Sequence, residues 1–235
     1  MKRIIIILVA FLLLFGGCSL VPPENATSKT VQPTEYDEYF TASQVDNKDL
    51  NEIISRNFAR NSALDNNTNK RGVSTRNKLI NEQNKEQIQR FEYGNYSAKE
   101  NSCEVIAVHN AKLLTGRQSS LSETIRDFQR NGLMIGDGSL GSNPYKLDVI
   151  LDKYGMEYTS VKLDEMTRQG IYVISYWRDG MALNGCHTVA VEYKQDMYIT
   201  YNLYGDGEIK TMSPNEYAKG YIVGFYLGEK KEIES

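Results

Sequence analysis

Side chains that can act as nucleophiles or general bases are rare in this chain, which has three cysteines and two histidines in 235 residues. Cys103 lies in "KENSCEVIAVHNAKLLTG", residues 99–116, where apolar residues recur at the spacing of one helix face. Asn101 or Ser102 can cap this helix, which places the thiol in its first turn. A free thiol is a weak nucleophile near neutral pH unless a helix N-terminus or a histidine favours the thiolate. We therefore expect the helix dipole to lower the pKa of Cys103.

The histidine partner of this thiol follows from helix geometry. His109 lies six residues after Cys103 on the same helix, about 240° round the axis, and points away from the thiol. His187 remains, at the start of the predicted strand "HTVAVEY". A histidine beside valines is often a buried, hydrogen-bonded core residue, so both a catalytic and a structural interpretation of His187 stay open.

A catalytic imidazole also needs a group that fixes its orientation. If the predicted hairpin turns at "YKQD", His187 lies opposite residues 202–204, and directly opposite residues are about 5 Å apart at Cβ. Asn202 is then the expected orienting residue. Asp206, in the glycine-flanked turn "GDG", is a second candidate, although this position favours a solvated turn residue.

Four segments, in order, carry a family resemblance: "NSCEVIAVHNAKLLTG", "GSNPYKLDVILDKYG", "GIYVISYW" and "HTVAVEYKQDMYITYNLYGDG". Together they resemble the papain-like cysteine peptidases, in the bacterial branch related to the double-glycine leader peptidases of bacteriocin exporters. The resemblance covers roughly residues 93–228. It implies an α+β, papain-like fold and a triad in which Cys103 is the nucleophile, His187 the general base and Asn202 the residue that orients the base.

The chain departs from that family at two places. Asn202 and Leu203 stand where the branch more often has Asp followed by Pro. The glutamine that normally donates to the oxyanion is also missing, because Gln89 is too far from the nucleophile. The N–H of Cys103, with the amide of Asn95 or Asn101, could replace it. Loss of one such donor typically costs a hundredfold or more in rate, so an inactive binding module remains an alternative.

The first residues predict export. Lys2 and Arg3 precede the apolar run "IIIILVAFLLLFGG", which is short for a membrane span of about twenty residues and is typical of a secretory signal. The stretch "LLLFGGCS" resembles the lipobox of bacterial lipoproteins, although Phe15 stands where leucine is usual. The resemblance implies a signal peptide over 1–17, acylation of Cys18 and attachment to the cell membrane, facing outside the cytoplasm. An ordinary cleaved signal is the alternative.

Composition divides the remainder of the chain. Residues 18–90 are rich in Asn, Lys, Gln, Ser and Thr, and we expect a polar tether, mostly disordered, with possible short helices at "DLNEIISRNFARN" and "NKLINEQNKEQIQRF". Residues 91–235 are expected to form the peptidase domain. Its helical patterns come first, including a capping box at Ser120 and Glu123. Period-two patterns follow and predict strands at "EYTSVKL" (157–163), "GIYVISYW" (170–177), "CHTVAVEY" (186–193), "MYITYNLY" (197–204), "EIKTM" (208–212) and "YIVGFYLGE" (221–229). The fold class is therefore α+β, with N-terminal helices packed on a C-terminal antiparallel sheet.

The sequence thus predicts a surface-anchored cysteine peptidase that cleaves peptide or amide bonds, acts on a peptide or protein substrate and is a monomer. No metal or other cofactor is expected, and no nucleic-acid partner is expected either, because a net charge of -3 gives no sign of a basic face. The strongest rival is an exported structural domain with a Cys103–Cys186 disulfide. Neighbouring strand residues face opposite ways, so His187 facing Cys103 would turn Cys186 away, which argues against this disulfide and against a zinc site from all three.

Overall fold

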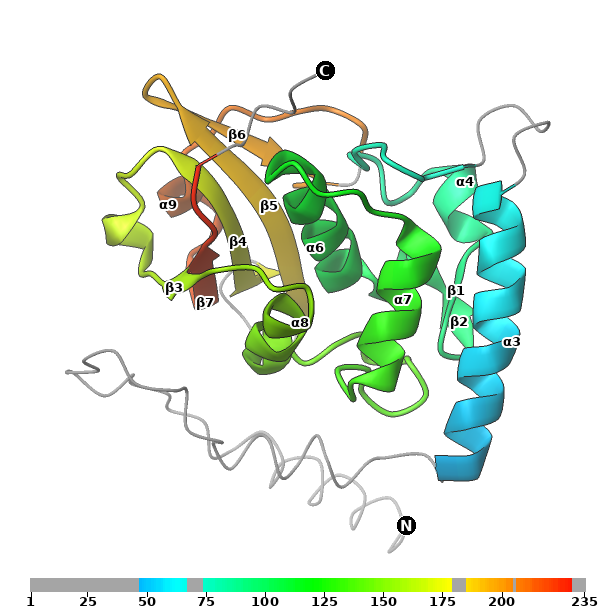
Figure 1. Ribbon diagram of the computed structural model, residues 1–235. Coiled ribbons are helices and arrows are strands. Elements are labelled where there is room, and N and C mark those ends of the chain that lie inside the picture. The colour runs from blue at the N-terminus through cyan, green and yellow to red at the C-terminus, as the bar shows by residue number, and fades with distance from the viewer. Residues whose placement is uncertain (1–46, 67–73, 179–184, 205, 230–235) are drawn as a thin grey trace, which may run out of the picture. The chain divides into compact units, whose positions relative to one another are not determined.

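The computed structural model describes residues 47–66, 74–178, 185–204 and 206–229, all within one compact unit (Figure 1). The expected signal peptide, Cys18 and the first part of the expected tether lie outside the described residues. Within the described ranges, no helix has both the length and the apolar character needed to cross a membrane.

The longer helices precede the main sheet in the chain, which confirms the predicted α+β order. Helix α6 carries the candidate nucleophile, and Gly116 with φ 80° follows its end, as a C-terminal glycine should. Ser120 accepts a hydrogen bond from the Glu123 N–H at the start of α7, as the capping box predicts. The helices are α3 (Asn47–Asn66), α4 (Glu86–Gln89), α5 (Ala98–Asn101), α6 (Cys103–Leu114), α7 (Leu121–Arg130), α8 (Leu147–Lys153) and α9 (Pro214–Tyr217), with 3-10 turns η1 (Pro144–Lys146) and η2 (Leu163–Glu165).

A five-stranded antiparallel sheet forms the second half, in the order β3-β7-β4-β5-β6. Its strands are β3 (Thr159–Ser160), β4 (Gly170–Trp177), β5 (Cys186–Lys194), β6 (Met197–Tyr201) and β7 (Gly220–Tyr226), and a separate pair joins β1 (Glu92–Tyr93) to β2 (Tyr96–Ser97). The predicted hairpin is confirmed: Lys194 pairs with Met197 across a two-residue turn in which both residues have positive φ.

Two predicted strands are shorter in the structure than expected, and the predicted strand 197–204 ends early. Residues 208–212 contribute a single bridge, Thr200 to Lys210, and residues 157–163 contribute only β3. Strand β6 stops at Tyr201 because Asn202 has φ 62°, a left-handed conformation that cannot continue a strand. The end of β6 therefore leaves the first residues of β5 unpaired on that side.

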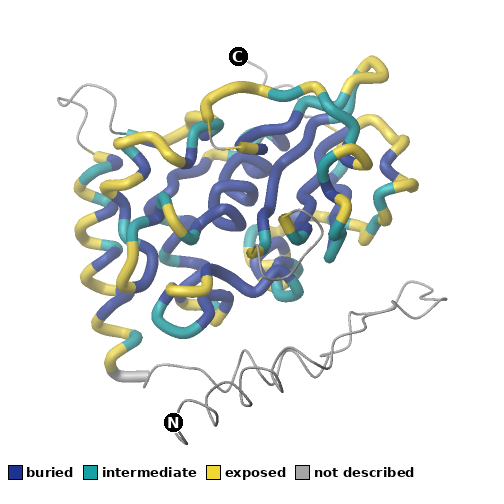
Figure 2. Tube along the Cα trace, turned by 180° about the vertical axis from the view of Figure 1, so that it is seen from behind, coloured by how far each residue is buried: buried dark blue, intermediate teal, exposed yellow. Residues whose placement is uncertain are grey.

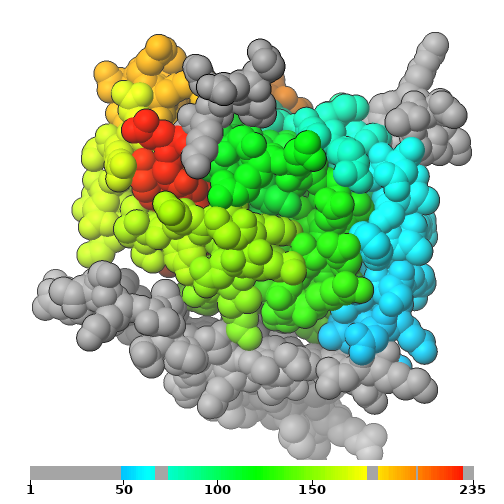
Figure 3. Space-filling model, in the orientation of Figure 1, coloured from blue at the N-terminus to red at the C-terminus, as the bar shows by residue number. Residues whose placement is uncertain are grey.

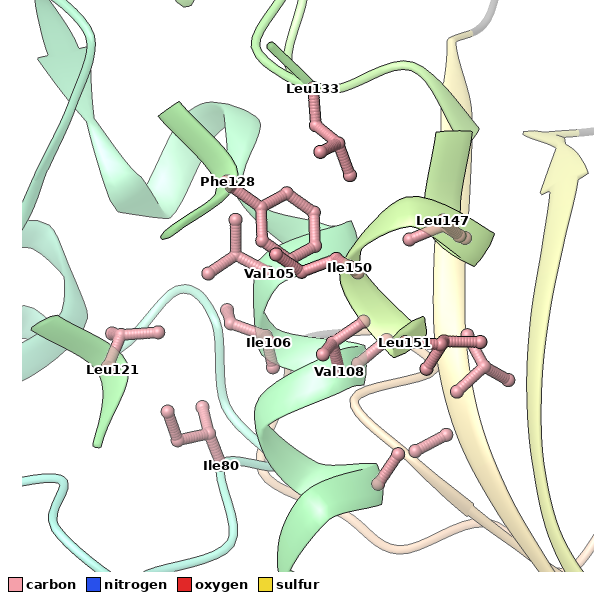
Figure 4. Packing of buried hydrophobic residues seen from close by; sticks show 14 of the residues in the cluster. Ile80, Val105, Ile106, Val108, Leu121, Phe128, Leu133, Leu147, Ile150 and Leu151 are labelled. Carbon is pink, nitrogen blue, oxygen red and sulfur yellow. The ribbon is translucent and has the colours of Figure 1, made fainter. Parts of the chain in front are cut away.

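Helix α6 packs across one face of the sheet and is almost wholly buried (Figure 2). Its side chains Val105, Ile106 and Val108 meet Phe128 of α7 and Ile150 of α8 (Figure 4). The same cluster includes Val173 of β4 and Ala190 of β5, whereas alternate residues of these strands form a second apolar cluster on the opposite face, with Met166, Ala218 and others. The α6 face thus holds the larger core.

Part of the segment that composition assigned to a tether belongs to this fold. Helix α3 lies along α7 and forms a continuous surface with it (Figures 1 and 3). Ile53 and Ile54 of α3 are buried, as are Ile80 and Ile88 of the following segment. Packed structure therefore begins well before residue 91.

Candidate active site

Cys103 is the first residue of α6 and its side chain is 7% exposed. Ser102 occupies the N-cap position, but its hydroxyl donates to the Ala98 carbonyl of α5 instead of accepting from the helix. The nearly continuous α5–α6 pair holds the thiol at the end of the sheet where β5 begins.

The Cys103 thiol contacts a side chain of its own helix and the backbone of β5. Its Sγ donates to Oε2 of Glu104 at 3.2 Å and lies 3.7 Å from the carbonyl oxygen of Cys186. The backbone N–H of Thr188 also donates to the sulfur, which by itself lowers the pKa of the Cys103 thiol. Since these two backbone groups stand on either side of His187, the thiol lies against the backbone of the histidine predicted to be its partner.

Burial raises the pKa of the Cys103 thiol well above its ordinary value, and the nearby Glu104 and Cys186 raise it further. The prediction that the helix dipole would lower this pKa is therefore wrong, because desolvation and a neighbouring acid outweigh the dipole at a buried position. In this arrangement the thiol is protonated at neutral pH.

His187 is 4% exposed, and burial lowers the pKa of its imidazole to about 4. Its Nε2 lies 2.8 Å from the main-chain carbonyl oxygen of Asn202. A carbonyl can only accept, so Nε2 carries the proton and Nδ1 is the unprotonated nitrogen. This Nδ1 is buried and has no hydrogen-bond partner in the described part of the chain. The ring is packed edge-on against Tyr176, its partner on β4, at 5.8 Å between centroids.

Cys186 and His187 point to opposite faces of β5, as alternation requires, but the face toward α6 belongs to Cys186. His187 shares the face of Val189 and the second cluster, whereas Cys186 shares that of Ala190. The expectation that His187 would face the helix and turn Cys186 away is therefore wrong. The thiol contacts the carbonyl of Cys186 and the N–H of Thr188, and Cys103 and Cys186 are both free.

Asn202 orients His187 through its main-chain carbonyl, and its side chain has another role. Its Oδ1 accepts from the Gln83 N–H at 3.0 Å, and its Nδ2 donates to Oε1 of Gln83 at 2.9 Å. Gln83 Nε2 donates in turn to the Lys99 carbonyl of α5 at 2.9 Å. The buried amide of Gln83 therefore joins the loop after β6 to the helix pair that carries Cys103.

The other expected site residues are engaged elsewhere. Asn101 Nδ2 donates to the Gly138 carbonyl at 2.9 Å, and exposed Asn95 bonds Asp137 and Arg56. The structure therefore does not bring either amide to the thiol as an oxyanion donor. Asp206 is exposed and accepts from the Glu208 N–H at 3.0 Å, which is the turn role that its position favours.

Glu104 is the residue that sequence reasoning missed, although it is the immediate neighbour of Cys103. Its side chain is 2% exposed, and burial raises the pKa of its carboxyl to about 7. A glutamate in the first turn of a helix is usually a solvated residue that complements the dipole, so nothing in its position signalled burial.

Among the described residues, no three His, Cys, Asp or Glu side chains gather into a set that could hold a metal ion.

Comparisons with known proteins give no family for this chain: no family model matches it, and no curated protein or solved structure does either.

Proposed function

We propose that the protein is an exported, lipid-anchored thiol hydrolase of the papain-like kind that cleaves peptide or amide bonds. Cys103 is the nucleophile and His187 the general base. The observation that carries this proposal is the imidazole itself: Nε2 is fixed by the Asn202 carbonyl, while Nδ1 is buried and has no hydrogen-bond partner among the residues that the structure describes. A buried acceptor without a partner costs free energy and therefore calls for an explanation. The Cys103 thiol contacts the backbone carbonyl of Cys186, the residue before this histidine.

The chemistry needs few further groups. The thiolate of Cys103 attacks the substrate carbonyl and forms a thioester as the amine leaves with a proton. Water then attacks the thioester while Nδ1 of His187 removes its proton, and the acid is released as the thiol re-forms. The N–H of Cys103 at the start of α6 is a donor for the developing oxyanion.

An activated ester such as p-nitrophenyl acetate tests this activity without knowledge of the natural substrate. We expect a burst of nitrophenol followed by turnover, and an acetyl group on Cys103 in the intact mass of the full chain. Cys103→Ala should abolish the burst. Acetylation that persists in Cys103→Ala, or an intact Cys103–Cys186 disulfide in a non-reduced peptide map, would overturn the proposal.

The second histidine provides a matched control for the base. His109 is buried and bonded on both sides, with Nε2 2.8 Å from the Lys78 carbonyl oxygen and Nδ1 2.9 Å from the Ser119 hydroxyl. We expect His109→Gln to lower the melting temperature while the folded protein still turns over ester. His187→Gln should abolish turnover in protein that remains folded. The reverse pattern would show that His187 is a structural residue.

A papain-like binding module without turnover is the second candidate. The observation that favours it is the burial of Cys103, which keeps the thiol protonated. That candidate predicts no acetylation of Cys103 by the activated ester and no loss of ligand binding in Cys103→Ala beyond any loss of stability.

The anchor is tested separately at Cys18. Acylation of this residue would hold the domain at the outer face of the membrane. Incorporation of labelled palmitate should disappear in Cys18→Ala, and the variant should move from the membrane fraction to the medium. Label retained by Cys18→Ala would contradict the anchor without affecting the proposed hydrolase.

A further inference from the structure

We propose that Glu104, and not His187, accepts the proton of the Cys103 thiol when the nucleophile is activated. This inference rests on the proposed hydrolase and divides its proton transfers between two bases. His187 then serves the second step, in which water attacks the thioester.

The contacts of the thiol carry the inference. Cys103 has one S–H, and its closest acceptor within the described ranges is Oε2 of Glu104 at 3.2 Å, compared with 3.7 Å for the Cys186 carbonyl. A carbonyl cannot take up the proton, but a carboxylate can. The imidazole of His187 is joined to the Asn202 carbonyl and makes no hydrogen bond through Nδ1 within the described residues. The thiol is therefore already connected to one base and not to the other.

The surroundings of Glu104 suit a group that takes and returns a proton. Burial has the largest effect on the carboxyl and raises its pKa, whereas hydrogen bonds from its own backbone, from Cys103 and from Cys186, and the charge of Arg178 after β4, lower it. Tyr93 of β1 also interacts electrostatically with the carboxyl, while its hydroxyl is hydrogen-bonded to Ser142. Burial outweighs these effects and leaves the pKa at about 7, so both forms of Glu104 are populated near neutral pH. A base is most effective when its pKa lies near the working pH.

The proposed step is balanced within these groups. The S–H bond of Cys103 breaks and an O–H bond forms on Oε2 of Glu104, while the sulfur electron pair attacks the carbonyl carbon. When the tetrahedral intermediate collapses, the proton on Glu104 passes to the departing amine or alcohol. In the second step Nδ1 of His187 takes a proton from water, and the imidazolium returns it to the sulfur as the acid leaves.

A purely electrostatic role for Glu104 predicts the opposite effect of its removal. The charged carboxylate raises the pKa of the Cys103 thiol, so a neutral residue there would lower that pKa and favour the thiolate. Glu104→Gln should therefore slow acylation if Glu104 is the base, and should speed acylation if Glu104 only disfavours the thiolate. The sign of the change decides between the two roles.

The experiment measures the burst rate with p-nitrophenyl acetate as a function of pH in the full chain. In the unchanged protein this rate should rise through about pH 7, with the fraction of ionised Glu104. Glu104→Gln should lose that inflection and about a hundredfold of the burst rate above it, as expected for loss of a general base. Glu123→Gln is the matched control, since Glu123 also lies in the first turn of a helix, α7, but its side chain is 41% exposed. A burst rate in Glu104→Gln that equals or exceeds that of the control would overturn the inference.

Two further variants separate this inference from the proposed hydrolase. His187→Gln should keep the burst and lose steady-state turnover, whereas loss of the burst itself would return the first proton transfer to His187. Persistent acetylation of Cys103→Ala would refute the hydrolase whatever Glu104 does.

Infrared spectroscopy of the unchanged protein should show a buried carboxylic acid band that titrates near pH 7 and is absent from Glu104→Gln. If Glu104→Gln does not fold, Glu104→Asp keeps the charge but withdraws the carboxyl from the sulfur, and should still lower the burst rate.

Discussion

Asn202 holds two parts of the molecule with different atoms of the same residue. Its carbonyl accepts from His187, and its side-chain amide pairs with Gln83. Its φ of 62° turns the chain so that both contacts form at once. Asparagine tolerates this left-handed conformation better than most residues, which accounts for its presence without any contact between its amide and the imidazole.

Two substitutions at this position separate the roles. Asn202→Gly keeps the carbonyl and accepts a positive φ, so we expect ester turnover to stay within severalfold of the unchanged protein. Asn202→Ala loses the same amide and adds a left-handed strain of about 1–2 kcal/mol, so it should melt several degrees below Asn202→Gly. Thermal melts and the ester assay check both expectations. Turnover as low in Asn202→Gly as in His187→Gln would show that the side-chain amide is essential.

Three buried groups should make stability depend on pH in opposite directions. Burial lowers the pKa of His109 and of His187 from 6.5 to about 4, so the unfolded chain binds more protons and the stability from these groups is lost as pH falls from about 6.5 to 4. Burial raises the pKa of Glu104 from 4.5 to about 7, so its contribution is present at acid pH and is lost as pH rises to about 7. Melting temperatures should therefore fall toward pH 4. The advantage of Glu104→Gln over the unchanged protein should grow between pH 4.5 and 7, and a constant difference would contradict the shifted carboxyl.

Helix position and the scarcity of histidine predicted a pair of Cys103 and His187. The structure brings the thiol to the backbone of Cys186 and Thr188, on either side of this histidine, and leaves the imidazole on the other face of β5. The burial of Glu104 and the pairing of Gln83 with Asn202 depend on segments that are distant in the chain. Local patterns carry no information about such contacts.

At the scale of elements, periodicity predicted the central strands well and the edges poorly. Strand β4 has the predicted bounds, and β5 extends the predicted strand by one residue, because both are buried runs bounded by glycine or polar turns. The segment 208–212 fails as a strand because it has a single bridge to β6 and exposed residues such as Ile209. Edge strands depend on neighbours that a local pattern does not specify.

Buried asparagine side chains bond the backbone of the segment before α5, as a neighbouring strand would. Asn110 of α6 accepts from the Ile80 N–H at 2.8 Å and donates to the Ile80 carbonyl at 2.7 Å. Asn61 of α3 makes the same pair of bonds with the backbone of Glu92, both at 2.9 Å. These amides satisfy backbone groups that would otherwise be buried without partners, and so they dock an irregular segment. An Asn-rich composition, read as a tether, is here part of the packing.

Asn110→Ala should leave the N–H and carbonyl of Ile80 buried and unpaired. Because each unsatisfied buried group costs about 1–3 kcal/mol, we expect this variant to lose at least ~2 kcal/mol of unfolding free energy. Asn131→Ala is the control, since its amide donates to the Asp127 carbonyl at a half-buried helix end and should cost less. Urea unfolding measures both. Equal losses of unfolding free energy in the two variants would show that the bonds of Asn110 to Ile80 contribute no more than the helix-end bond of Asn131.

At the scale of the whole molecule, the candidate site depends on a segment far from it in sequence. Asn81 Oδ1 accepts from the Asn202 N–H at 2.5 Å, and its Nδ2 donates to the Gly207 carbonyl at 2.7 Å. These bonds of Asn81 and the bonds between Gln83 and Asn202 together form a clamp on the loop after β6, whose Asn202 carbonyl accepts from His187. Composition could not reveal this dependence, because these hydrogen bonds join side-chain amides to residues more than 100 positions away in the chain.

Truncations test whether the domain includes that segment. A chain of residues 47–235 keeps α3, the buried Ile80 and Ile88 and the clamp on Asn202. We expect it to fold cooperatively and to be acetylated at Cys103. A chain that begins at residue 91, where composition alone would place the boundary, loses these groups and exposes the apolar face of α6 and α7 that they cover. It should melt broadly or aggregate, and Cys103 should show no burst with the ester. Circular dichroism and intact mass compare the two chains. Cooperative unfolding and normal acetylation in the 91–235 chain would show that residues 91–235 fold without the earlier segment. Asn202 would then hold His187 without the clamp.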